Sequence, residues 1–290
     1  STPRAAHASD HRTLLADDER ELCVACHPVW DEMAMPQRHP PFDGRFCTNC
    51  HDPHASEWTG ILVLRQRELC FTCHPSVAYL SGKAVQHHPF YYDNCTGCHE
   101  PHASEATPLL IRYQPELCYD CHAGIRYDFL KPSHHPVGAA DFTCADCHDP
   151  HAADYTYLLT ARDNEMCFTC HEGSIRATYD SSAHWNTLCI GCHTPHGSDY
   201  APILRQRNPE LCYRCHPDTR NANEEYPANH PHRPDLFFDV LAEEPLTCST
   251  SCHDPHGSSY FYMMRYPYGN GGYGRDYVCM RCHTGVGVDF

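Results

Sequence analysis

Cysteine pairs followed at once by a histidine dominate this chain of 290 residues, which contains 22 cysteines and 26 histidines. Ten of the pairs share the spacing C-x-x-C-H, and they are Cys23/Cys26/His27, Cys47/Cys50/His51, Cys70/Cys73/His74, Cys95/Cys98/His99, Cys118/Cys121/His122, Cys144/Cys147/His148, Cys167/Cys170/His171, Cys189/Cys192/His193, Cys212/Cys215/His216 and Cys279/Cys282/His283. The remaining pair is longer by one residue, C-x-x-x-C-H, at Cys248/Cys252/His253. No cysteine is left over, so any fold of this chain must place eleven such groups with about 26 residues for each.

The C-x-x-C-H pattern is the attachment signature of haem c. The two thiols form thioethers with the porphyrin vinyl groups, and the adjacent histidine is placed to ligate the iron. Zinc ribbons, thioredoxin-like redox pairs and disulfide frameworks are the alternatives, and the C-x2-C-x20-C-x2-C run through Cys26 and Cys47 has zinc-like spacing. None of these alternatives requires a histidine after every second cysteine. The sequence therefore predicts eleven covalently bound haem c groups, with the motif histidines as proximal iron ligands.

The motifs, numbered in chain order, alternate between two types and so define a repeat of two haems. Odd motifs follow an acidic, helix-like lead such as Glu68-Leu69-Cys70, whereas even motifs continue as C-H-x-P-H. We expect a single elongated domain that begins with a C-terminal half-repeat, 1–22, and ends with an N-terminal half-repeat, 279–290. Between them we expect five two-haem repeats, 23–69, 70–117, 118–166, 167–211 and 212–278.

Composition limits the fold that can surround these groups. The chain contains 24 prolines and 16 glycines, which interrupt regular structure throughout. With so few residues per haem, the macrocycles themselves must form most of the core. We therefore predict a haem-dominated fold, mostly coil with short α-helices at the odd motifs, arranged as a linear array of two-haem repeats with almost no β-sheet.

Fifteen histidines remain after the proximal ligands, and eleven second axial ligands are needed for six-coordinate iron. The histidine of C-H-x-P-H must serve a neighbouring haem, because three residues cannot carry the chain to the other face of its own macrocycle. Loop histidines between odd and even motifs recur in register, mostly before proline. The predicted second ligands of these two kinds are His54, His102, His151, His196 and His256, together with His39, His88, His135, His184 and His230.

Alignment to His39-Pro40 selects His88 over His87 and His135 over His134, while His232 is a rival of His230. The eleventh ligand is predicted to be His7, which lies 16 residues before Cys23, as His54 lies 16 residues before Cys70. His7, rather than His11, is the equivalent residue. We expect the spare histidines to be surface residues or to contact haem propionates; they are His11, His87, His134 and His232.

Charge and context limit the partners and the compartment. The formal net charge of −16 argues against nucleic acid and against anionic membrane surfaces. No stretch approaches the roughly 18 apolar residues of a spanning helix, so the chain is not expected to cross a membrane. It opens at Ser1 without an initiator Met, as expected of a mature secreted chain. Because haem c is attached outside the cytoplasm, we expect an extracellular or cell-surface protein, with the periplasm as the alternative.

The alternation of C-x-x-C-H with C-x-x-C-H-x-P-H resembles the sequences of multihaem cytochromes with doubled motifs. These include the decahaem conduits that thread outer-membrane porins. In that family each pair is self-contained, with its distal histidines downstream of its first motif. The sequence is also similar to extracellular cytochrome filaments, in which an N-terminal histidine ligates a haem of the neighbouring subunit. That resemblance implies a homopolymer in which His7 caps the haem of Cys279/Cys282/His283 in the next copy. In the rival register each histidine serves the haem that follows it, so that His7 acts within its own chain and His256 serves the haem of Cys279.

These features favour an electron conduit of bis-histidine haems over an enzyme. A multihaem reductase of nitrite, hydroxylamine or sulfite needs an open distal position, whereas the free histidines here outnumber those required. If one haem differs, the stretched motif at Cys248/Cys252 is the first candidate. A third class, haem storage or a structural coat, would need no continuous chain of haems. Besides copies of itself, we expect other redox proteins or extracellular acceptors as partners.

Overall fold

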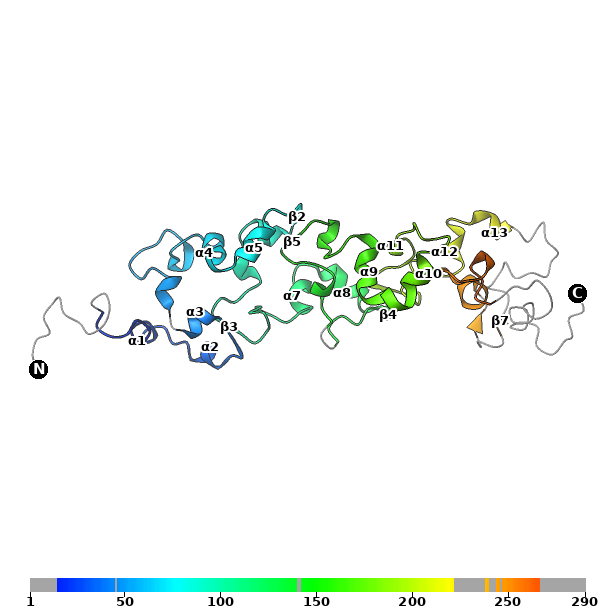
Figure 1. Ribbon diagram of the computed structural model, residues 1–290. Helices are drawn as coiled ribbons and strands as arrows, with labels where there is room; N and C mark the ends of the chain where they lie inside the picture. Colours follow the sequence, from blue (N-terminus) through cyan, green and yellow to red (C-terminus); the bar gives the residue numbers. More distant parts are fainter. Residues whose placement is uncertain are drawn as a thin grey trace, which may run out of the picture. The chain divides into compact units, whose positions relative to one another are not determined.

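The computed structural model describes residues 15–44, 46–139, 142–221, 238–239, 244–245 and 247–266. The chain divides into two compact units, Ser1–Ala123 with Val137–Thr160 and Gly124–Pro136 with Ala161–Phe290. Short helices joined by coil make up both units, and the sheets of the described residues have two strands each (Figure 1). The expected fold class, mostly coil with short α-helices and almost no β-sheet, is confirmed.

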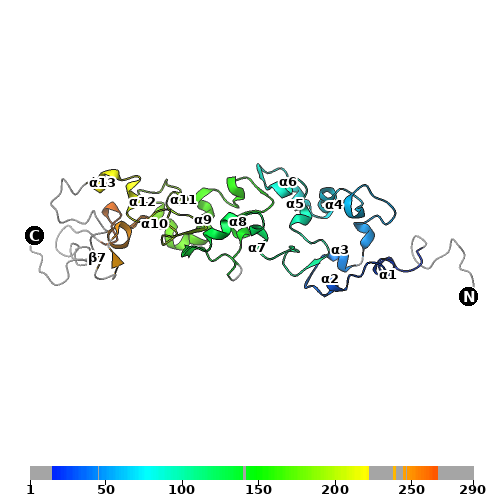
Figure 2. The same ribbon diagram turned by 180° about the vertical axis from the view of Figure 1, so that it is seen from behind.

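In the first unit, the acidic leads of the odd motifs form helices that carry the cysteines. Helix α4 ends at Cys73, and α5 begins at Pro75, a residue that fits the first helical position because its missing N–H would have no partner there. The two helices lie side by side in both views (Figures 1 and 2). The elements of this unit are α1 (Glu19–Val24), α2 (Trp30–Ala34), β1 (Gln37–Arg38), α3 (Pro40–Asp43), η2 (Cys47–Asn49), η3 (Thr59–Ile61), α4 (Gln66–Cys73), α5 (Pro75–Leu80), β2 (Val85–Gln86), α6 (His88–Tyr91), η4 (Cys95–Gly97), β3 (Ala103–Ser104), α7 (Glu116–Tyr119), η5 (Cys144–Asp146), β5 (Ala152–Ala153) and η6 (Thr156–Leu158).

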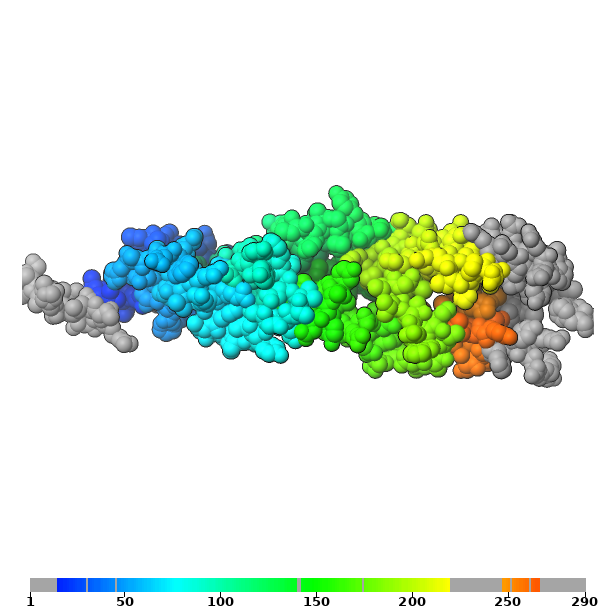
Figure 3. Space-filling view, turned by 90° about the horizontal axis from the view of Figure 1, so that it is seen from above, coloured from blue at the N-terminus to red at the C-terminus, as the bar shows by residue number. Residues whose placement is uncertain are grey.

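In the second unit the odd motifs are again helical, while the even motifs form the four-residue helix α11 and the π-helical turn η9. The space-filling view shows openings between its yellow and light-green segments (Figure 3). Its elements are α8 (Ala123–Asp128, which begins at the boundary), β4 (Ser133–His134), α9 (Asp163–His171), the π-helical turn η7 (Glu172–Arg176), α10 (Ala177–Tyr179), α11 (Cys189–Cys192), β6 (Gly197–Ser198), α12 (Glu210–Tyr213), α13 (Pro217–Asn221), β7 (Phe238–Asp239), β8 (Glu244–Pro245), the π-helical turn η9 (Cys248–Cys252) and η10 (Phe261–Met263).

Short antiparallel ladders join each pair of motifs to the next pair along the chain. Strand β1 pairs with β3 through Arg38↔Ala103, although 65 residues separate them, and β2 pairs with β5 through Val85↔Ala153. In the second unit β4 pairs with β6 through Ser133↔Ser198. Strands β1 and β2 each end one residue before a loop histidine. Their partner strands, β3 and β5, each begin one residue after a C-H-x-P-H histidine. The ladders therefore bring the two kinds of predicted second ligand side by side.

Small residues line these ladders. Ala103 and Ala152 each retain only 1% of their accessible surface, because a second backbone packs directly against them. At the equivalent Gly197, an added Cβ would collide with the carbonyl oxygen of Asp128. Large buried apolar residues are few among the described residues, and the buried set is Ala103, Ala106, Leu110, Ala152, Ala153, Met166, Phe168 and Tyr179.

So small an apolar core cannot offset the entropy of ordering a chain of this length. We therefore predict that the polypeptide produced without haem attachment is unfolded. Circular dichroism of the haem-free chain should show a coil spectrum without a cooperative thermal transition. A spectrum like that of the haem-loaded protein would contradict this prediction.

A search of the described helices finds none that is both long and apolar enough to span a bilayer.

Candidate haem sites

The motifs in the described part of the chain fold into turns that place the histidine against the first cysteine. The His51 N–H donates to the carbonyl of Cys47 at 3.0 Å, and the His27 N–H donates to that of Cys23 at 2.8 Å. The stretched motif makes the same bond, His253 N–H to Cys248 O at 2.8 Å. It does so because η9 is a π-helical turn that absorbs the extra residue. The first candidate for an unusual haem therefore has an ordinary turn geometry.

Odd motifs place their histidine opposite a loop histidine from the preceding pair. The ring centres of His39 and His74 lie 6.0 Å apart with an interplanar angle of 17°. The same arrangement recurs three times, in His87–His122 at 6.0 Å, His135–His171 at 6.3 Å and His184–His216 at 6.2 Å.

Even motifs place their histidine opposite a C-H-x-P-H histidine of the following pair. The ring centres are 6.0 Å apart in His51–His102, 5.9 Å in His99–His151 and 5.9 Å in His193–His256. In the first three pairs of motifs, each pair gives one loop histidine to the next pair, and the first two pairs each receive a C-H-x-P-H histidine from it. These facing rings differ from the self-contained pair implied by the family resemblance, and His256 faces His193, which the rival register did not expect. The ligation of His7 and of the haem of Cys279 lies outside the described residues.

These spacings fit a haem iron between the two rings. In a bis-histidine haem the iron bonds a ring nitrogen on each side at about 2 Å, and each nitrogen lies about 1 Å from its ring centre, so the centres are about 6 Å apart. The seven facing pairs span 5.9–6.3 Å. The motif cysteines lie beside the proximal histidines, where they can hold the porphyrin. The residues present therefore fit haem c, which when bound supplies an iron that takes up and releases one electron.

At two loops, two histidines are adjacent, and only one of them faces a proximal histidine. His87, not His88, faces a proximal histidine, while the His88 ring packs on Tyr92 at 4.5 Å between centres. The structure departs from the prediction of His88, because the histidine that faces a proximal histidine is the residue between strand and helix, and α6 begins one residue earlier relative to its proline than α3 does. His135 occupies the predicted place, and the ring of His134 is instead hydrogen-bonded to the carbonyl of His135 at 2.8 Å.

Burial favours the neutral, ligating form of these imidazoles. Desolvation lowers the pKa of His39, His87, His151 and His256 below the ordinary histidine value. Only an unprotonated ring nitrogen can bind a metal, so a lowered pKa keeps more of each side chain ready for iron at neutral pH.

Thiols of neighbouring motifs lie next to each other in chain order. Within a pair, the thiols of Cys70 and Cys95 are within hydrogen-bonding reach, and this contact lowers the pKa of Cys95 to about 7. The same contact, together with burial, raises the pKa of Cys70. Equivalent contacts join Cys23 to Cys47, Cys118 to Cys144, Cys167 to Cys189 and Cys212 to Cys248. Haems attached at these positions are neighbours within each pair.

Between one pair of motifs and the next, the second cysteines lie close enough to interact electrostatically. Cys50 interacts electrostatically with Cys73, Cys98 with Cys121, and Cys192 with Cys212 and Cys215. Hydrogen-bonding thiols within a pair therefore alternate with electrostatically interacting thiols between pairs. Among the described residues of each unit, successive attachment sites are linked in this way.

The sixth motif, which contains Cys147 and His148, is the last motif of the first unit. The His148 N–H donates to the carbonyl of Cys144 at 3.0 Å, and its Nδ1 is bonded to the carbonyl of Tyr157 at 2.7 Å. The carbonyl of Cys147 in turn accepts the N–H of Thr160 at 3.0 Å. Both residues therefore have the turn geometry of the other even motifs.

The seventh motif, which contains Cys170, is the first motif that lies wholly in the second unit. Cys170 lies near the end of α9, and its exposed side chain places Sγ 3.9 Å from Thr169 Oγ1. The step from Cys147 to Cys170 crosses from one unit to the other. Haem binding by Cys147, Cys170 and His148 therefore stays a prediction from their motifs.

A polar side chain before the odd motif makes a hydrogen bond to the even motif of the same pair. The sequence analysis did not predict these residues. Glu19 Oε1 accepts the N–H of Thr48 at 2.6 Å, Gln66 Oε1 accepts that of Cys95 at 3.0 Å, and Gln114 Oε1 accepts that of Ala145 at 3.3 Å. Asn208 Nδ2 donates to Ser249 Oγ at 2.6 Å. These four residues all lie four positions before an odd motif's first cysteine, a recurrence that could have revealed them.

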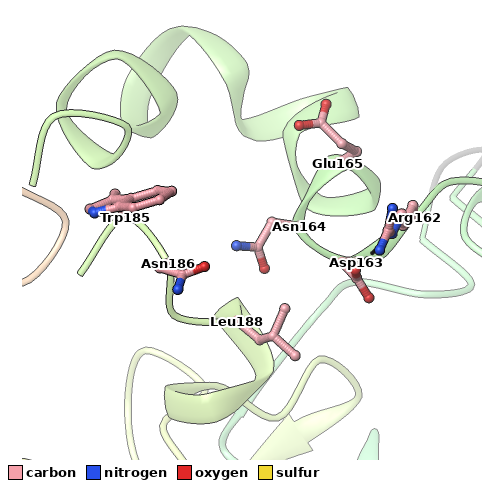
Figure 4. A pocket seen from close by; sticks show the side chains of 7 residues that line it. All are labelled: Arg162, Asp163, Asn164, Glu165, Trp185, Asn186 and Leu188. Atoms are coloured by element: carbon pink, nitrogen blue, oxygen red, sulfur yellow. Dashed lines mark hydrogen bonds and ion pairs between the residues drawn. The ribbon is translucent and has the colours of Figure 1, made fainter.

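Asn164 has the same role in the second unit, where its Oδ1 accepts the N–H of Cys189 at 2.8 Å. It lies in a pocket of about 240 Å³ between the start of α9 and the loop that carries Trp185 (Figure 4). The pocket is lined without histidine or cysteine, by Arg162, Asp163, Asn164, Glu165, Trp185, Asn186 and Leu188. No group of three or more His, Cys, Asp or Glu in the described ranges is arranged to hold a bare metal ion.

Several predicted site residues lie outside the described residues. They are His7, His230, Cys279, Cys282 and His283, together with the spare histidines His11 and His232. Among the described residues no second histidine ring faces His27, His54 or His253.

Comparison with known families decides the class. A family model described as the doubled CXXCH motif matches residues 39–79, 87–126, 134–175 and 184–221, which is more than half of the chain. The chain belongs to the doubled CXXCH motif family. It is thus a multihaem c-type cytochrome, in a family whose members are typically electron carriers and in some cases reductases. Among curated proteins, none matches it.

The matched segments of this multihaem cytochrome follow the ligand pairing. Each contains a loop histidine and the odd-motif histidine that faces it, as in 39–79 with His39 and His74. The repeats expected from the sequence begin instead at the odd motifs. The family unit is therefore offset from those repeats and keeps both axial ligands of one haem together.

Proposed function

We propose that this multihaem cytochrome conducts electrons along eleven bis-histidine haems, outside the cytoplasm, and that copies of it join head to tail. The observation that carries the conduit is the series of thiol contacts between successive motifs. Because each thiol becomes a covalent link to a porphyrin, such as Cys70 in one motif and Cys95 in the next, the porphyrin edges are held as neighbours. Electrons then need no diffusing carrier between sites.

The facing histidines support electron transfer rather than substrate chemistry. A haem with two imidazoles has no position for a substrate oxygen or nitrogen, and it changes little in geometry between oxidation states. The reductase alternative would need an open position, and His27 and His253 are the candidates because no described histidine ring faces either. A high-spin absorption band in the purified oxidised protein would favour that alternative, and its absence would favour the conduit.

Assembly through a histidine of a neighbouring copy is supported by the exposure of His54. Its side chain is 95% exposed, whereas those of the equivalent His102, His151 and His256 are 42%, 31% and 36% exposed. Each of those three residues faces an even-motif histidine of the preceding pair in the chain. The same relation between copies would direct His54 to an even motif, and His253 is the described even-motif histidine that no ring faces.

Backbone hydrogen bonds also support assembly through the segment that follows His54. The carbonyls of His102 and His151 accept hydrogen bonds from the N–H groups of His39 and His87, both at 2.9 Å. Ala55, the equivalent of the buried Ala103, is exposed, so the segment after His54 offers an open edge of the kind that β1 covers elsewhere. The expected His7 donor remains a second candidate, toward the haem of Cys279.

His54→Ala should prevent assembly while leaving the haem count unchanged. Electron microscopy of purified protein should show fibres for the wild type and separate particles for the variant. His88→Ala is the matched control, since it removes a histidine that faces no motif histidine. Fibres formed by His54→Ala but lost in His7→Ala would transfer the role to His7, and separate particles of wild-type protein would contradict assembly altogether.

A further inference from the structure

The outer nitrogens of the ligating histidines meet two different sets of acceptors. At odd haems the loop histidine has its Nδ1 bonded to a proline carbonyl, as in His87 to Pro150 O at 2.8 Å and His184 to Pro255 O at 2.9 Å. The opposite rings of these haems, His122 and His216, make no hydrogen bond with another described residue. Within the described residues, the odd haems of His122 and His216 thus have a neutral acceptor on one axial ligand only.

At even haems both axial ligands are engaged. The motif histidine bonds through Nδ1 to a carbonyl nine residues later, as in His51 to Gly60 O at 2.7 Å and His99 to Pro108 O at 3.1 Å. The stretched motif does the same, with His253 to Tyr262 O at 2.8 Å.

The second ligand of an even haem lies beside a carboxylate. For His151, which faces His99, the Nδ1 is 3.6 Å from Asp149 Oδ1, and the side chains are 31% and 30% exposed. His102 and His256 are placed likewise, 3.9 Å from Glu100 and 3.8 Å from Asp254. Asp149 is held in this position because its Oδ1 accepts the backbone N–H of His151 at 2.9 Å, which leaves the carboxylate charge close to the ring Nδ1.

An acceptor on the outer N–H makes an imidazole a stronger donor to its metal, and a negative charge does so more than a carbonyl. Stronger donation and a nearby anion both stabilise ferric over ferrous iron, which lowers the reduction potential. We propose that the two motif types hold their haems at two potentials, with the even haems more negative than the odd haems. This inference rests on the proposed conduit, because it sets the energy profile that electrons meet along it.

The alternation has a direct consequence for electron flow. A partly reduced molecule would carry its electrons on the odd haems, and each transfer to an even haem would run uphill. One repeat departs from the pattern, since Thr194 stands where the others have Asp or Glu before the histidine of C-H-x-P-H. Its Oγ1 donates to the Gly197 carbonyl at 3.0 Å, so the haem that His196 ligates has no carboxylate from this position. That haem should be the most positive of the even set.

The test is potentiometric titration of the haem-loaded protein, followed by optical absorption and by electron paramagnetic resonance. The wild type should titrate as two groups, and Asp149→Asn should move one haem of the low-potential group to a more positive potential. Asn keeps the oxygen that accepts the His151 N–H, so the turn is preserved while the charge is lost. Asp154→Asn is the control, because Asp154 pairs with Lys83 at 2.6 Å on the surface. Thr194→Asp should move one haem in the opposite direction.

A titration in one group, or identical curves for Asp149→Asn and Asp154→Asn, would overturn the inference. Conductance through a film of the protein separates this failure from a failure of the conduit. A film that conducts while its haems titrate as one group removes the alternation alone. A film that does not conduct removes the proposed function, whatever the titration shows.

Discussion

His87→Ala is expected to open the sixth position of one haem per chain relative to the wild type, whereas His88→Ala is expected to leave the coordination of the haems unchanged. The His87 ring faces His122 with 6.0 Å between centres, as the two ligands of one iron require. The His88 ring instead packs on Tyr92. Removal of His87 therefore leaves iron bound on one side only, and such iron is high-spin and takes up carbon monoxide.

The absorption spectrum of the reduced protein under carbon monoxide measures this difference. The His87→Ala variant should bind one carbon monoxide per chain more than the wild type, and His88→Ala should bind no more than the wild type. The two residues are adjacent and of the same type, so a general loss of folding would affect both. The opposite result would return the ligand role to His88, as alignment of the prolines suggested.

Gly197→Ala is expected to destabilise the haem-loaded protein by about 3 kcal/mol, the upper part of the range for overpacking. A Cβ at this position would collide with the carbonyl oxygen of Asp128, lie 2.8 Å from its carbonyl carbon and lie 3.3 Å from His134 Cβ. Backbone cannot turn aside as a side chain can, so β6 must move away from the end of α8 at Asp128. Thermal unfolding followed at the haem absorption band should show a clear fall in Tm.

Gly124→Ala provides the control for that substitution. Gly124 lies within α8, and nothing comes within 4 Å of the added Cβ. Alanine is also the better helix former, so Tm should stay the same or rise slightly. If both variants unfold at the wild-type temperature, the close contact at β6 does not contribute to stability.

Local pattern was sufficient for the parts of the site that depend on neighbours in sequence. The proximal ligand follows its cysteine directly, so Cys70, Cys73 and His74 could be named without knowledge of the fold. The mostly irregular structure also followed from the prolines and glycines. The stretched motif at Cys248 was harder to interpret, because only the three-dimensional turn shows that a π-helical residue restores the position of His253.

Ligand pairing could not be predicted because it depends on strand contacts over long separations. Arg38 meets Ala103 in a two-residue ladder, and nothing in such short strands distinguishes this register from others. Alignment on proline selected His88 because a proline follows it. The structure uses the position between strand and helix, and this is His87. Proline marks where a helix can begin, but it does not fix which side chain faces the next motif.

The mass of the purified, denatured polypeptide, combined with a count of alkylatable thiols, is the most direct test of the central claim. The account predicts the mass of the 33.0 kDa chain plus eleven haems, with none of the 22 cysteines open to alkylation even after reduction. A chain without added haem mass, whose cysteines react after reduction or after removal of zinc, would contradict it.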